Sequence, residues 1–295
     1  MPRLSLPQLS VMIPVKNGMP YLKSTIASTL FAMPRDSELL VMDDGSTDGT
    51  TEFLASGRDK RLKVFRNEES VGVAAAGTAL LGHATGEHVA RMDGDDICLP
   101  WRFSVERRAL KGADIVFSPM LLISARNLPF RPYLERGLSV DAVPLHLLLG
   151  NVLANPTMYG TRAALESLDG YQKTHAEDYD MWLRAATMGI RMRRLDALPT
   201  VLYRRHSTQL SRSRPWDRKS DDVVLERSFQ ALAETAIGFK GSASTVLYNR
   251  PRSNQPYPTD PDIQEFANGV LEACGRLKKG DRRILETRLR SVYRV

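Results

Sequence analysis

The 295-residue sequence contains only two cysteines, Cys98 and Cys274, which lie far apart along the chain. Neither belongs to a C-x-x-C motif or has a histidine close by, so the sequence predicts neither a disulfide framework nor a zinc site. We expect both thiols to be reduced. Cys98 lies near a run of aspartates, but its residue type favours the role of a small buried side chain.

Long hydrophobic runs are also absent. The longest apolar stretches, such as residues 11–15 and 145–149, are far shorter than the roughly 20 residues needed to cross a bilayer. Residues 1–9 lack the apolar segment of a signal peptide, and we find no internal repeat or low-complexity segment. We therefore expect a globular protein that stays in the cytoplasm.

The positive charge is confined to one end of the chain. The net charge is +7, and residues 276–295 hold eight Lys and Arg residues against Asp281 and Glu286. The rest is nearly neutral, which argues against nucleic-acid binding. Two interpretations stay open: an amphipathic helix at the membrane surface or on an anionic acceptor, and a helix packed on its own domain. The apolar residues at near-helical spacing are Leu277, Ile284, Leu285, Leu289 and Val292.

Short apolar strands alternate with helical segments in the first hundred residues. This rhythm predicts an α/β fold with a mostly parallel sheet covered by helices on both faces, in which ligands bind beyond the carboxyl ends of the strands. The expected strands are residues 10–15, 38–42, 62–65 and 87–92, and the expected helices are residues 21–31, 47–55 and 73–83.

The pattern changes after Pro100, where we expect a helix. The chain then divides into a domain of residues 1–215 and a helical C-terminal extension of residues 216–295. The expected elements are strands at 114–118, 155–160 and 199–204, a loop through Pro129 and Pro132, helices at 140–149, 177–188, 216–240 and 263–293, and a proline-containing loop at 249–261.

Three aspartates, Asp93, Asp95 and Asp96, directly follow the expected strand at 87–92. Carboxylates crowded at the end of a buried strand repel one another and resist desolvation, so a cation between them is favoured. Oxygen ligands suit Mg²⁺ or Mn²⁺, which often complete their shell with substrate phosphates. The alternative is a solvated turn in which Asp96 caps the helix that starts near Pro100.

Polar residues also follow two earlier strands. Asn17 comes after the first strand, and Asp43 and Asp44 come after the second. Because parallel strands end at the same edge of a sheet, these residues should meet the acidic run there, which favours the ligand-binding interpretation. For Asp44 and Ser46, we expect structural roles in the turn.

Four blocks of the sequence resemble the family 2 glycosyltransferases of the GT-A fold. The blocks are SVMIPVKNGMPYL, LLVMDDGSTDGT, VGVAAAGTALLGHATGEHVARMDGDDICLPWRF, and GYQKTHAEDYDMWLRAATMG followed by LYRRHSTQLS, and they span about residues 9–211. The resemblance implies a GT-A type, Rossmann-like sheet in which residues 1–99 bind a nucleotide sugar and residues 100–215 bind the acceptor. It also implies transfer to a hydroxyl of a glycan, lipid-linked or other glycoconjugate acceptor.

On the donor side, the resemblance implies that Pro14, Val15 and Asn17 line the nucleotide pocket. Asp43 would receive the base, because a carboxylate can accept from the uracil N3–H. UDP is therefore the first expectation, with dTDP and GDP left open.

The resemblance places Asp93, Gly94 and Asp95 at the DxD motif of the family. It implies that Asp95 binds a Mn²⁺ or Mg²⁺ ion directly and that Asp93 lies nearer the ribose or a metal-bound water. His206 follows the last strand, where related proteins often carry a histidine that contacts the metal or diphosphate. A structural hydrogen bond is the alternative for His206, and Arg204 and Arg205 are either diphosphate partners or surface residues.

Asp178 matches the catalytic base of the family, and Glu177 would position it or the acceptor. Direct displacement with inversion needs such a base on the face of the sugar opposite the leaving diphosphate. No arginine should depress the pKa of Asp178, because helical spacing places Arg184 on a different face of the helix.

Two positions depart from the family pattern. Gly77-Thr78 stand where many members have Arg-Asn, so this chain lacks any donor contact that those side chains make elsewhere. Gly94 replaces the commoner alanine, and we expect it to loosen the turn slightly.

Three other classes fit less well. A sugar nucleotidyltransferase would carry a Gly-rich phosphate loop after the first strand, where this chain has Val15-Lys16-Asn17-Gly18. A dinucleotide-binding domain would need G-x-G-x-x-G, which is absent. A non-catalytic glycosyltransferase-like partner subunit would have lost the metal carboxylates or the base, and this chain retains Asp93, Asp95 and Asp178.

Overall fold

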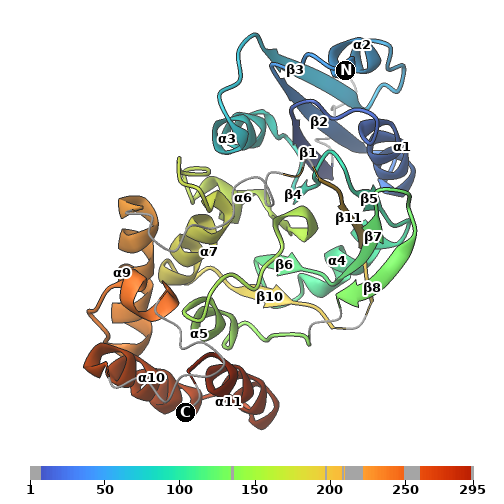
Figure 1. Cartoon of the computed structure of the whole chain (residues 1–295). Helices are drawn as coiled ribbons and strands as arrows, with labels where there is room; N and C mark the ends of the chain where they lie inside the picture. The colour runs from blue at the N-terminus through green and yellow to red at the C-terminus, as the bar shows by residue number, and fades with distance from the viewer. Residues whose placement is uncertain are drawn as a thin grey trace, which may run out of the picture.

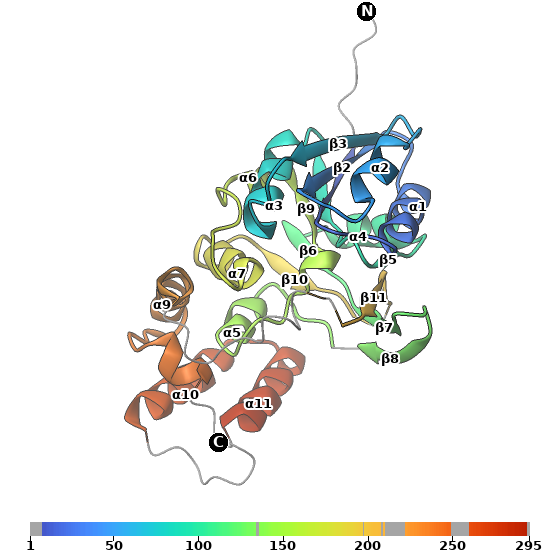
Figure 2. The same cartoon turned by 45° about the horizontal axis from the view of Figure 1, so that its top comes forward.

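The computed structural model describes residues 8–133, 136–196, 198–207, 209, 222–248 and 260–293. A seven-stranded sheet lies at the centre and a four-stranded sheet lies beside it (Figures 1 and 2). The C-terminal helices pack against α5 (Val143–Leu147) and α7 (Glu177–Thr187). The predicted α/β fold class, a mostly parallel sheet flanked by helices, is confirmed.

The first hundred residues alternate strands and helices as predicted. The strands β4, β1, β2 and β3 lie side by side and parallel. Every residue of β1 and β2 is buried, because helices cover both faces of the sheet. The elements are β1 (Leu9–Val15), α1 (Leu22–Ala32), β2 (Ser37–Asp44), α2 (Thr50–Ala55), β3 (Leu62–Asn67), α3 (Val73–His83) and β4 (His88–Arg91).

Three further strands complete the large sheet, in the order β10-β6-β9-β4-β1-β2-β3. They are β6 (Ile115–Phe117), β9 (Tyr159–Thr161) and β10 (Met192–Arg194). β9 runs antiparallel to both of its neighbours. The segment 155–160, predicted as a strand, begins instead as the 3-10 turn η1 (Asn155–Thr157) with Pro156 in its first turn, and only its end joins the sheet.

The smaller sheet corrects one sequence prediction. It contains β5 (Ile97–Cys98), β11 (Val201–Arg205), β7 (Met120–Ser124) and β8 (Pro129–Tyr133), in the order β5-β11-β7-β8. The loop expected through Pro129 and Pro132 was wrong, because this segment is β8, paired antiparallel with β7. Proline lacks the backbone N–H that a central strand needs, but β8 lies at the edge of its sheet, where that donor is not required.

Four helices connect the strands of the second half: α4 (Arg102–Ala109), α5 (Val143–Leu147), α6 (Arg162–Glu166) and α7 (Glu177–Thr187). The helix predicted over residues 140–149 is shorter than expected. The side chain of Trp182, on α7, is fully buried and packs edge-on against Phe117 of β6, with ring centroids 4.8 Å apart. Packing of this kind holds α7 against one face of the large sheet.

The C-terminal extension contains α9 (Val223–Ile237), a π-helical turn η2 (Ser244–Tyr248), α10 (Pro261–Cys274) and α11 (Lys279–Tyr293). The single helix predicted over residues 263–293 was wrong, because the chain breaks between α10 and α11. The break lets both amphipathic helices bury their apolar faces, and the rings of Phe266 and Tyr293 lie 5.8 Å apart. The predicted helix start at Trp216 and most of the loop 249–261 lie outside the described residues.

The extension and the sheet share one hydrophobic cluster. Phe229 of α9, Phe266 of α10 and Tyr293 of α11 belong to the same buried cluster as Trp182 of α7. The predicted boundary between residues 215 and 216 therefore separates two groups of elements that have a continuous core. Within the described residues, no helix is long and apolar enough to cross a membrane.

Candidate active site

The turns after β1 and β2 bind each other through side-chain hydrogen bonds. Asn17 lies just beyond β1 with a left-handed φ of 53°, and its backbone N–H donates to the hydroxyl of Ser46 over 2.9 Å. The N–H of Thr47 donates back to Asn17 Oδ1 over 2.9 Å. Pro14 and Val15, at the end of β1, are buried. These contacts join two of the predicted donor-binding segments.

Asp43, predicted to receive the base, is 1% exposed and anchored within its own turn. Its Oδ1 accepts from the N–H of Ser46 over 3.0 Å, and its Oδ2 accepts from the hydroxyl of Thr51 over 2.5 Å. Each carboxylate oxygen has more than one acceptor position. These two bonds therefore orient the carboxylate without using all of its capacity.

Asp44 has the structural role that the sequence predicted. Its carboxylate accepts hydrogen bonds from Asn67, Ser70 and the backbone N–H groups of Val71 and Gly72, all between 2.7 and 2.9 Å. Burial alone would raise the pKa of Asp44, but these four bonds, led by that of Asn67, hold it below its ordinary value. Asp44 therefore ties β2 to the segment before α3.

The first aspartate of the acidic run has a cationic partner that the sequence reading missed. The guanidinium of Arg91, the last residue of β4, lies 3.2 Å from Asp93 Oδ1. Arg91 is only 3% exposed and also lies over the ring of Tyr171, 5.8 Å from its centroid. The pair could have been predicted from the sequence, because Arg91 ends a buried strand directly before the acidic run, and a buried cation needs a nearby carboxylate.

Arg91 also explains the departure at Gly77. A β-carbon at Gly77 would come within 3.1 Å of the Arg91 guanidinium and of the Tyr171 ring. Arg91 of β4 therefore occupies the space that a longer side chain at position 77 of α3 would need. At Gly94, a β-carbon would lie 2.9 Å from Val15 Cγ2. The expectation that Gly94 only loosens the turn was incomplete, because Val15 presses against this position.

Asp96 is fully buried and does not cap a helix. Its Oδ1 accepts from the backbone N–H of Arg204 over 2.8 Å, whereas α4 begins after Trp101 without any side-chain cap. The alternative in which Asp96 caps that helix was therefore wrong. Among the described residues, Asp96 Oδ2 has no hydrogen-bond partner. Burial, together with the nearby charges of Asp95 and Asp93, raises the pKa of Asp96 well above its ordinary value.

The end of β11 closes over the acidic run. The Nε2 atom of His206 lies 2.8 Å from Asp95 Oδ2, and Arg204 Nε donates to the backbone oxygen of Asp95 over 2.6 Å. Arg204 is 1% exposed, with its guanidinium 4.7 Å from the ring centroid of Tyr21. The interpretation of Arg204 as a surface residue was therefore wrong, because its side chain is buried. A role for Arg204 as a diphosphate partner stays a prediction. Arg204 clamps the backbone of the acidic turn.

The oxygen and nitrogen atoms around the acidic run can be compared with the ligands that a divalent metal ion needs. Within the described ranges, no three His, Cys, Asp or Glu side chains converge in the manner of a protein-only metal site. Asp95 and His206 do converge, and Asp96 contributes an unpartnered buried oxygen three chain positions from Asp93, whose Oδ1 is held by Arg91. This set suits an ion that takes the rest of its shell from substrate phosphates, as Mg²⁺ commonly does.

Asp178 lies in the first turn of α7 and is held by two hydrogen bonds. Its Oδ1 accepts from the N–H of Tyr179 over 2.7 Å, and its Oδ2 accepts from the side-chain amide of Asn151 over 3.0 Å. Burial, together with the charges of Glu177 and Asp93, raises the pKa of Asp178 to about 7, although the hydrogen bonds from Tyr179 and Asn151 oppose this shift. Asn151 was not found from the sequence, because it lies 27 residues from Asp178 without any motif.

Among the described residues, no arginine forms an ion pair with the Asp178 carboxylate, and Arg184 binds elsewhere. Arg184 forms an ion pair of 2.9 Å with Asp180, four residues before it, and its other nitrogens donate to the carbonyls of Leu168 and Gly170. Burial also raises the pKa of Glu177, although the charge of Arg91 opposes this effect. Glu177 and Asp178 therefore both feel the charges at the end of β4, which brings α7 and the acidic run into one site.

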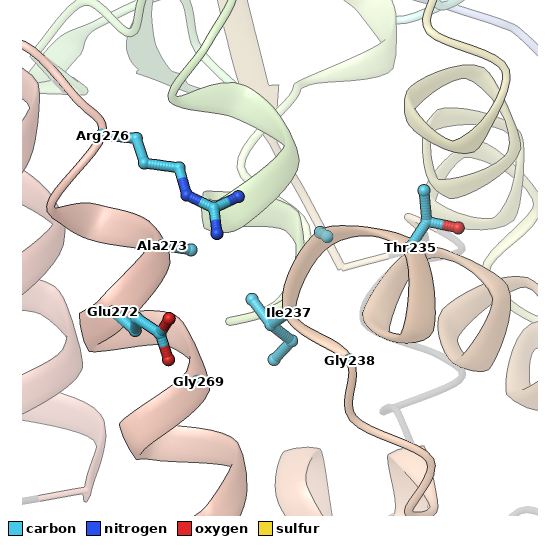
Figure 3. A pocket seen from close by; sticks show the side chains of 8 residues that line it. Thr235, Ile237, Gly238, Gly269, Glu272, Ala273 and Arg276 are labelled. Atoms are coloured by element: carbon cyan, nitrogen blue, oxygen red, sulfur yellow. The ribbon is translucent and has the colours of Figure 1, made fainter.

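Two cavities lie away from this site. One, of about 180 Å³, opens between the end of α9 and α10, and its lining includes Ile237, Glu272 and Arg276 (Figure 3). The other, of about 230 Å³, is lined by Gln8 and His88 at the amino-terminal ends of β1 and β4 and by Arg107 of α4. None of the predicted site residues lines either cavity. The chemistry-bearing side chains lie instead at the carboxyl ends of the strands.

The fold and this edge define a class: an α/β protein with acidic, metal-compatible turns beyond a mostly parallel sheet and a carboxyl group of raised pKa beside them. The chain belongs to the glycosyl transferase family 2, whose family model matches residues 10–165. It is a glycosyltransferase, and the family predicted from the sequence is confirmed.

Relatives cover most of the chain. It is 28% identical over 272 residues to the putative glycosyltransferase EpsE of Bacillus subtilis, covering 88% of this chain and 90% of that protein. It is 24% identical over 211 residues to an Escherichia coli protein, WfaP, named as a UDP-Glc:alpha-D-GlcNAc-diphosphoundecaprenol beta-1,3-glucosyltransferase, covering 69% and 79%. The crystal structure of S. aureus TarS 1-349 with UDP-GlcNAc shares the fold, with a TM-score of 0.64, 17% identity and coverage of 97% and 89%.

Proposed function

We propose that this protein is a metal-dependent, inverting glycosyltransferase that moves a sugar from a UDP-sugar to a hydroxyl group of a glycan or lipid-linked acceptor. The observation that carries the proposal is the arrangement around Asp178. A carboxyl group with a pKa of about 7 lies close enough to the acidic run for the charge of Asp93 to affect it. A general base works best when its pKa lies near the working pH.

The reaction is a single displacement. Asp178 takes the proton of the acceptor hydroxyl while that oxygen attacks the anomeric carbon of the sugar. The bond between this carbon and the diphosphate oxygen breaks, its electron pair leaves with the nucleoside diphosphate, and the configuration inverts. Glu177 supports this role because its charge is among the effects that raise the pKa of Asp178.

The donor binds at the ends of β1, β2 and β4. Pro14, Val15 and Asn17 line the nucleotide side, and Asp43 accepts from the base with the acceptor positions that Ser46 and Thr51 leave open. Asp95, with His206 and Asp93 beside it, would hold a Mn²⁺ or Mg²⁺ ion. When bound, this ion neutralises charge on the leaving diphosphate.

The nature of the donor and acceptor rests on two kinds of support. Asp43 suits the uracil N3–H, WfaP is named for UDP-Glc, and TarS was solved with UDP-GlcNAc, which favours UDP over dTDP and GDP. WfaP is also named for an acceptor that carries a lipid diphosphate. A lipid-linked acceptor is therefore the first class to test.

Contact with a membrane surface would be electrostatic. Leu285, Leu289 and Tyr293 of α11 are buried within the protein, so this helix packs on its own domain and does not offer an apolar face to lipid. Its outward side and the preceding turn are basic, and we propose that they contact the anionic headgroups around a lipid-linked acceptor. The exposed cations are Arg276, Lys278, Lys279, Arg282, Arg283 and Arg290.

Calorimetric titration with UDP, dTDP and GDP, each with and without Mn²⁺, tests the donor site. We expect UDP to bind with metal and to bind at least tenfold more weakly without it. Binding that is the same with and without metal would contradict metal dependence. Incubation with UDP-sugars and a lipid diphosphate acceptor, followed by NMR assignment of the anomeric configuration in the product, tests transfer and inversion. Retention of configuration would contradict the displacement.

A further inference from the structure

The loop between α5 and η1 connects the C-terminal extension with Asp178. This loop contains Gly150, whose φ of 104° suits only glycine, and Asn151. The Oδ1 atom of Asn151 accepts from the backbone N–H of Leu153 over 3.0 Å. Because that oxygen is occupied by a donor, the amide nitrogen must face the Asp178 carboxylate, to which it donates over 3.0 Å.

The loop is held from the other side by Arg288 of α11. One guanidinium nitrogen donates to the carbonyl of His146 over 2.8 Å, and the other donates to the carbonyls of Leu149 at 2.9 Å and Gly150 at 3.2 Å. The planar guanidinium suits several carbonyls in one direction, which lysine does not match. In both views α11 lies directly beside α5, far along the sequence from the loop (Figures 1 and 2).

We infer that the C-terminal extension completes the active site: Arg288 clamps the loop 149–151, and Asn151 thereby orients the carboxylate of Asp178. This inference rests on the proposed function in taking Asp178 as the base. Asn151 and Arg288 are positioning residues, because neither is placed against the sugar or the nucleotide. The extension thus has a role in transfer, in addition to packing against the core.

The orientation matters because each Asp178 oxygen is fixed by one donor. Tyr179 N–H holds Oδ1 and Asn151 holds Oδ2, so the carboxylate cannot rotate, and its remaining lone pairs point in set directions. The charges of Glu177, on its own helix, and of Asp93, at the end of β4, act on Asp178, and the Tyr171 phenol also lies within reach of its charge. Glu177 and Asp93 are anionic, so the Asn151 amide is a neutral donor among repelling charges, and its loss leaves only the Tyr179 N–H to oppose that repulsion.

The first test measures catalysis in Asn151→Ala and Arg288→Ala. Asn268→Ala and Arg227→Ala are the matched controls, because these residues are exposed on α10 and α9 and belong neither to the clamp nor to the basic surface of α11. We expect kcat to fall roughly 10- to 100-fold in Asn151→Ala and by less in Arg288→Ala, with donor KM and metal-dependent UDP affinity unchanged. Arg288→Lys should recover only part of the loss. Equal losses in the controls, or unchanged kcat in both clamp variants, would overturn the inference.

The second test does not depend on transfer. The protein is labelled with carboxyl-¹³C aspartate, the Asp178 signal is assigned by its loss in Asp178→Asn, and its titration is followed by NMR. Since the Asn151 amide stabilises the charged carboxylate, Asp178 should titrate at higher pH in Asn151→Ala and also in Arg288→Ala, and the rising limb of the pH–kcat profile should move with it.

The outcomes separate the two proposals. An unchanged Asp178 titration in both variants would overturn the clamp, whether or not the wild-type protein transfers sugar. A titration that moves as expected supports the clamp. If the wild-type protein then transfers no sugar from any donor, the proposed function fails by itself. Thermal unfolding of each variant shows whether it is folded, and Asn151→Ala, at an exposed loop position, should unfold within a few degrees of wild type.

Discussion

The two ends of this site, which we propose bind the donor (the donor end) and supply the base (the base end), are built in opposite ways. At the donor end, the turns after β1 and β2 bind one another through Asn17, Ser46 and Thr47, within about 30 residues of chain. At the base end, Asp178 depends on Asn151, and the loop of Asn151 depends on Arg288, 137 positions away. A site assembled from neighbouring strand ends is set by the sheet itself. The base end is set only when the C-terminal helices have packed.

The largest effect that separates the two ends should come from Asp178→Asn. Removing the base should lower transfer about 10²- to 10⁴-fold, because an amide cannot accept the proton. Metal-dependent UDP binding should change little, because the nucleotide contacts lie at the other end. Parallel assays of transfer and calorimetric binding check this. Transfer at the wild-type rate would show that Asp178 is not the base.

Asp95→Ala, in contrast to Asp178→Asn, should weaken metal-dependent UDP binding. Loss of this carboxylate removes the partner of His206 and a candidate metal ligand, so metal-dependent UDP affinity should fall at least tenfold. UDP binding measured without metal should change by much less. His206→Ala should cause a smaller loss in the same direction. Calorimetry across a Mn²⁺ series measures both, and an Asp95→Ala affinity equal to wild type would remove Asp95 from the metal site.

Asp44→Asn should destabilise the donor end by about 2–3 kcal/mol at pH 7, because four donors lose their charged acceptor. The pKa of Asp44 in the folded protein is lower than its ordinary 3.8. The stability that Asp44 contributes is therefore fully present above about pH 3.8 and is lost as the pH falls through the lower folded pKa. The difference between wild type and variant in urea unfolding should therefore shrink in strong acid. A difference that stays constant down to pH 2 would contradict this explanation.

Asp178 should show the opposite dependence on pH. Its folded pKa of about 7 exceeds the ordinary 3.8, so its contribution to stability is present below about pH 4 and is lost as the pH rises through 7. Asp178→Asn avoids that loss and should be more stable than wild type by about 1–2 kcal/mol at pH 8, allowing for partial solvent exposure. Urea unfolding at pH 5 and pH 8 checks the sign, and a variant less stable at pH 8 would contradict it.

The smallest effect should come from Gly94→Ala. The added methyl group meets Val15 Cγ2 at 2.9 Å, so the donor end must shift at a cost of about 1 kcal/mol, with UDP binding weaker by several fold. Val15→Ala removes the obstructing atom and should recover part of the affinity in the double variant. Val15→Ala alone provides the control for lost packing. Additive effects in the double-mutant cycle would show that the two side chains do not compete for this space.

The sequence predicted the donor end better than the base end for a physical reason. Parallel strands leave a sheet at one edge, so Asn17, Asp43 and Asp93 could be brought together from strand periodicity alone. Asp178 was found through a family resemblance, and its partner Asn151 has no signal in the sequence. The burial of Arg204 could not be predicted because it depends on Tyr21 and on the acidic turn, both more than 100 residues away along the chain.

The errors in the fold have similar causes. The strand Pro129–Tyr133 was read as a loop because proline disfavours a central strand, and only the sheet order shows that this strand lies at an edge. The break between α10 and α11 was missed because their apolar periodicity runs on nearly without interruption. Both errors depend on the position of an element relative to its neighbours in the fold, and a local sequence pattern carries no information on that position.

The sequence by itself determined the alternation of strands and helices, the parallel sheet, and the polar turns that follow its strands. These features depend on local periodicity and on short turns, whose physics is contained in a few neighbouring residues. The tertiary structure decided which charges pair, as between Arg91 and Asp93 or His206 and Asp95. It also decided that Arg288 supports the loop beside Asp178, because contacts between distant segments form only when the whole core has packed.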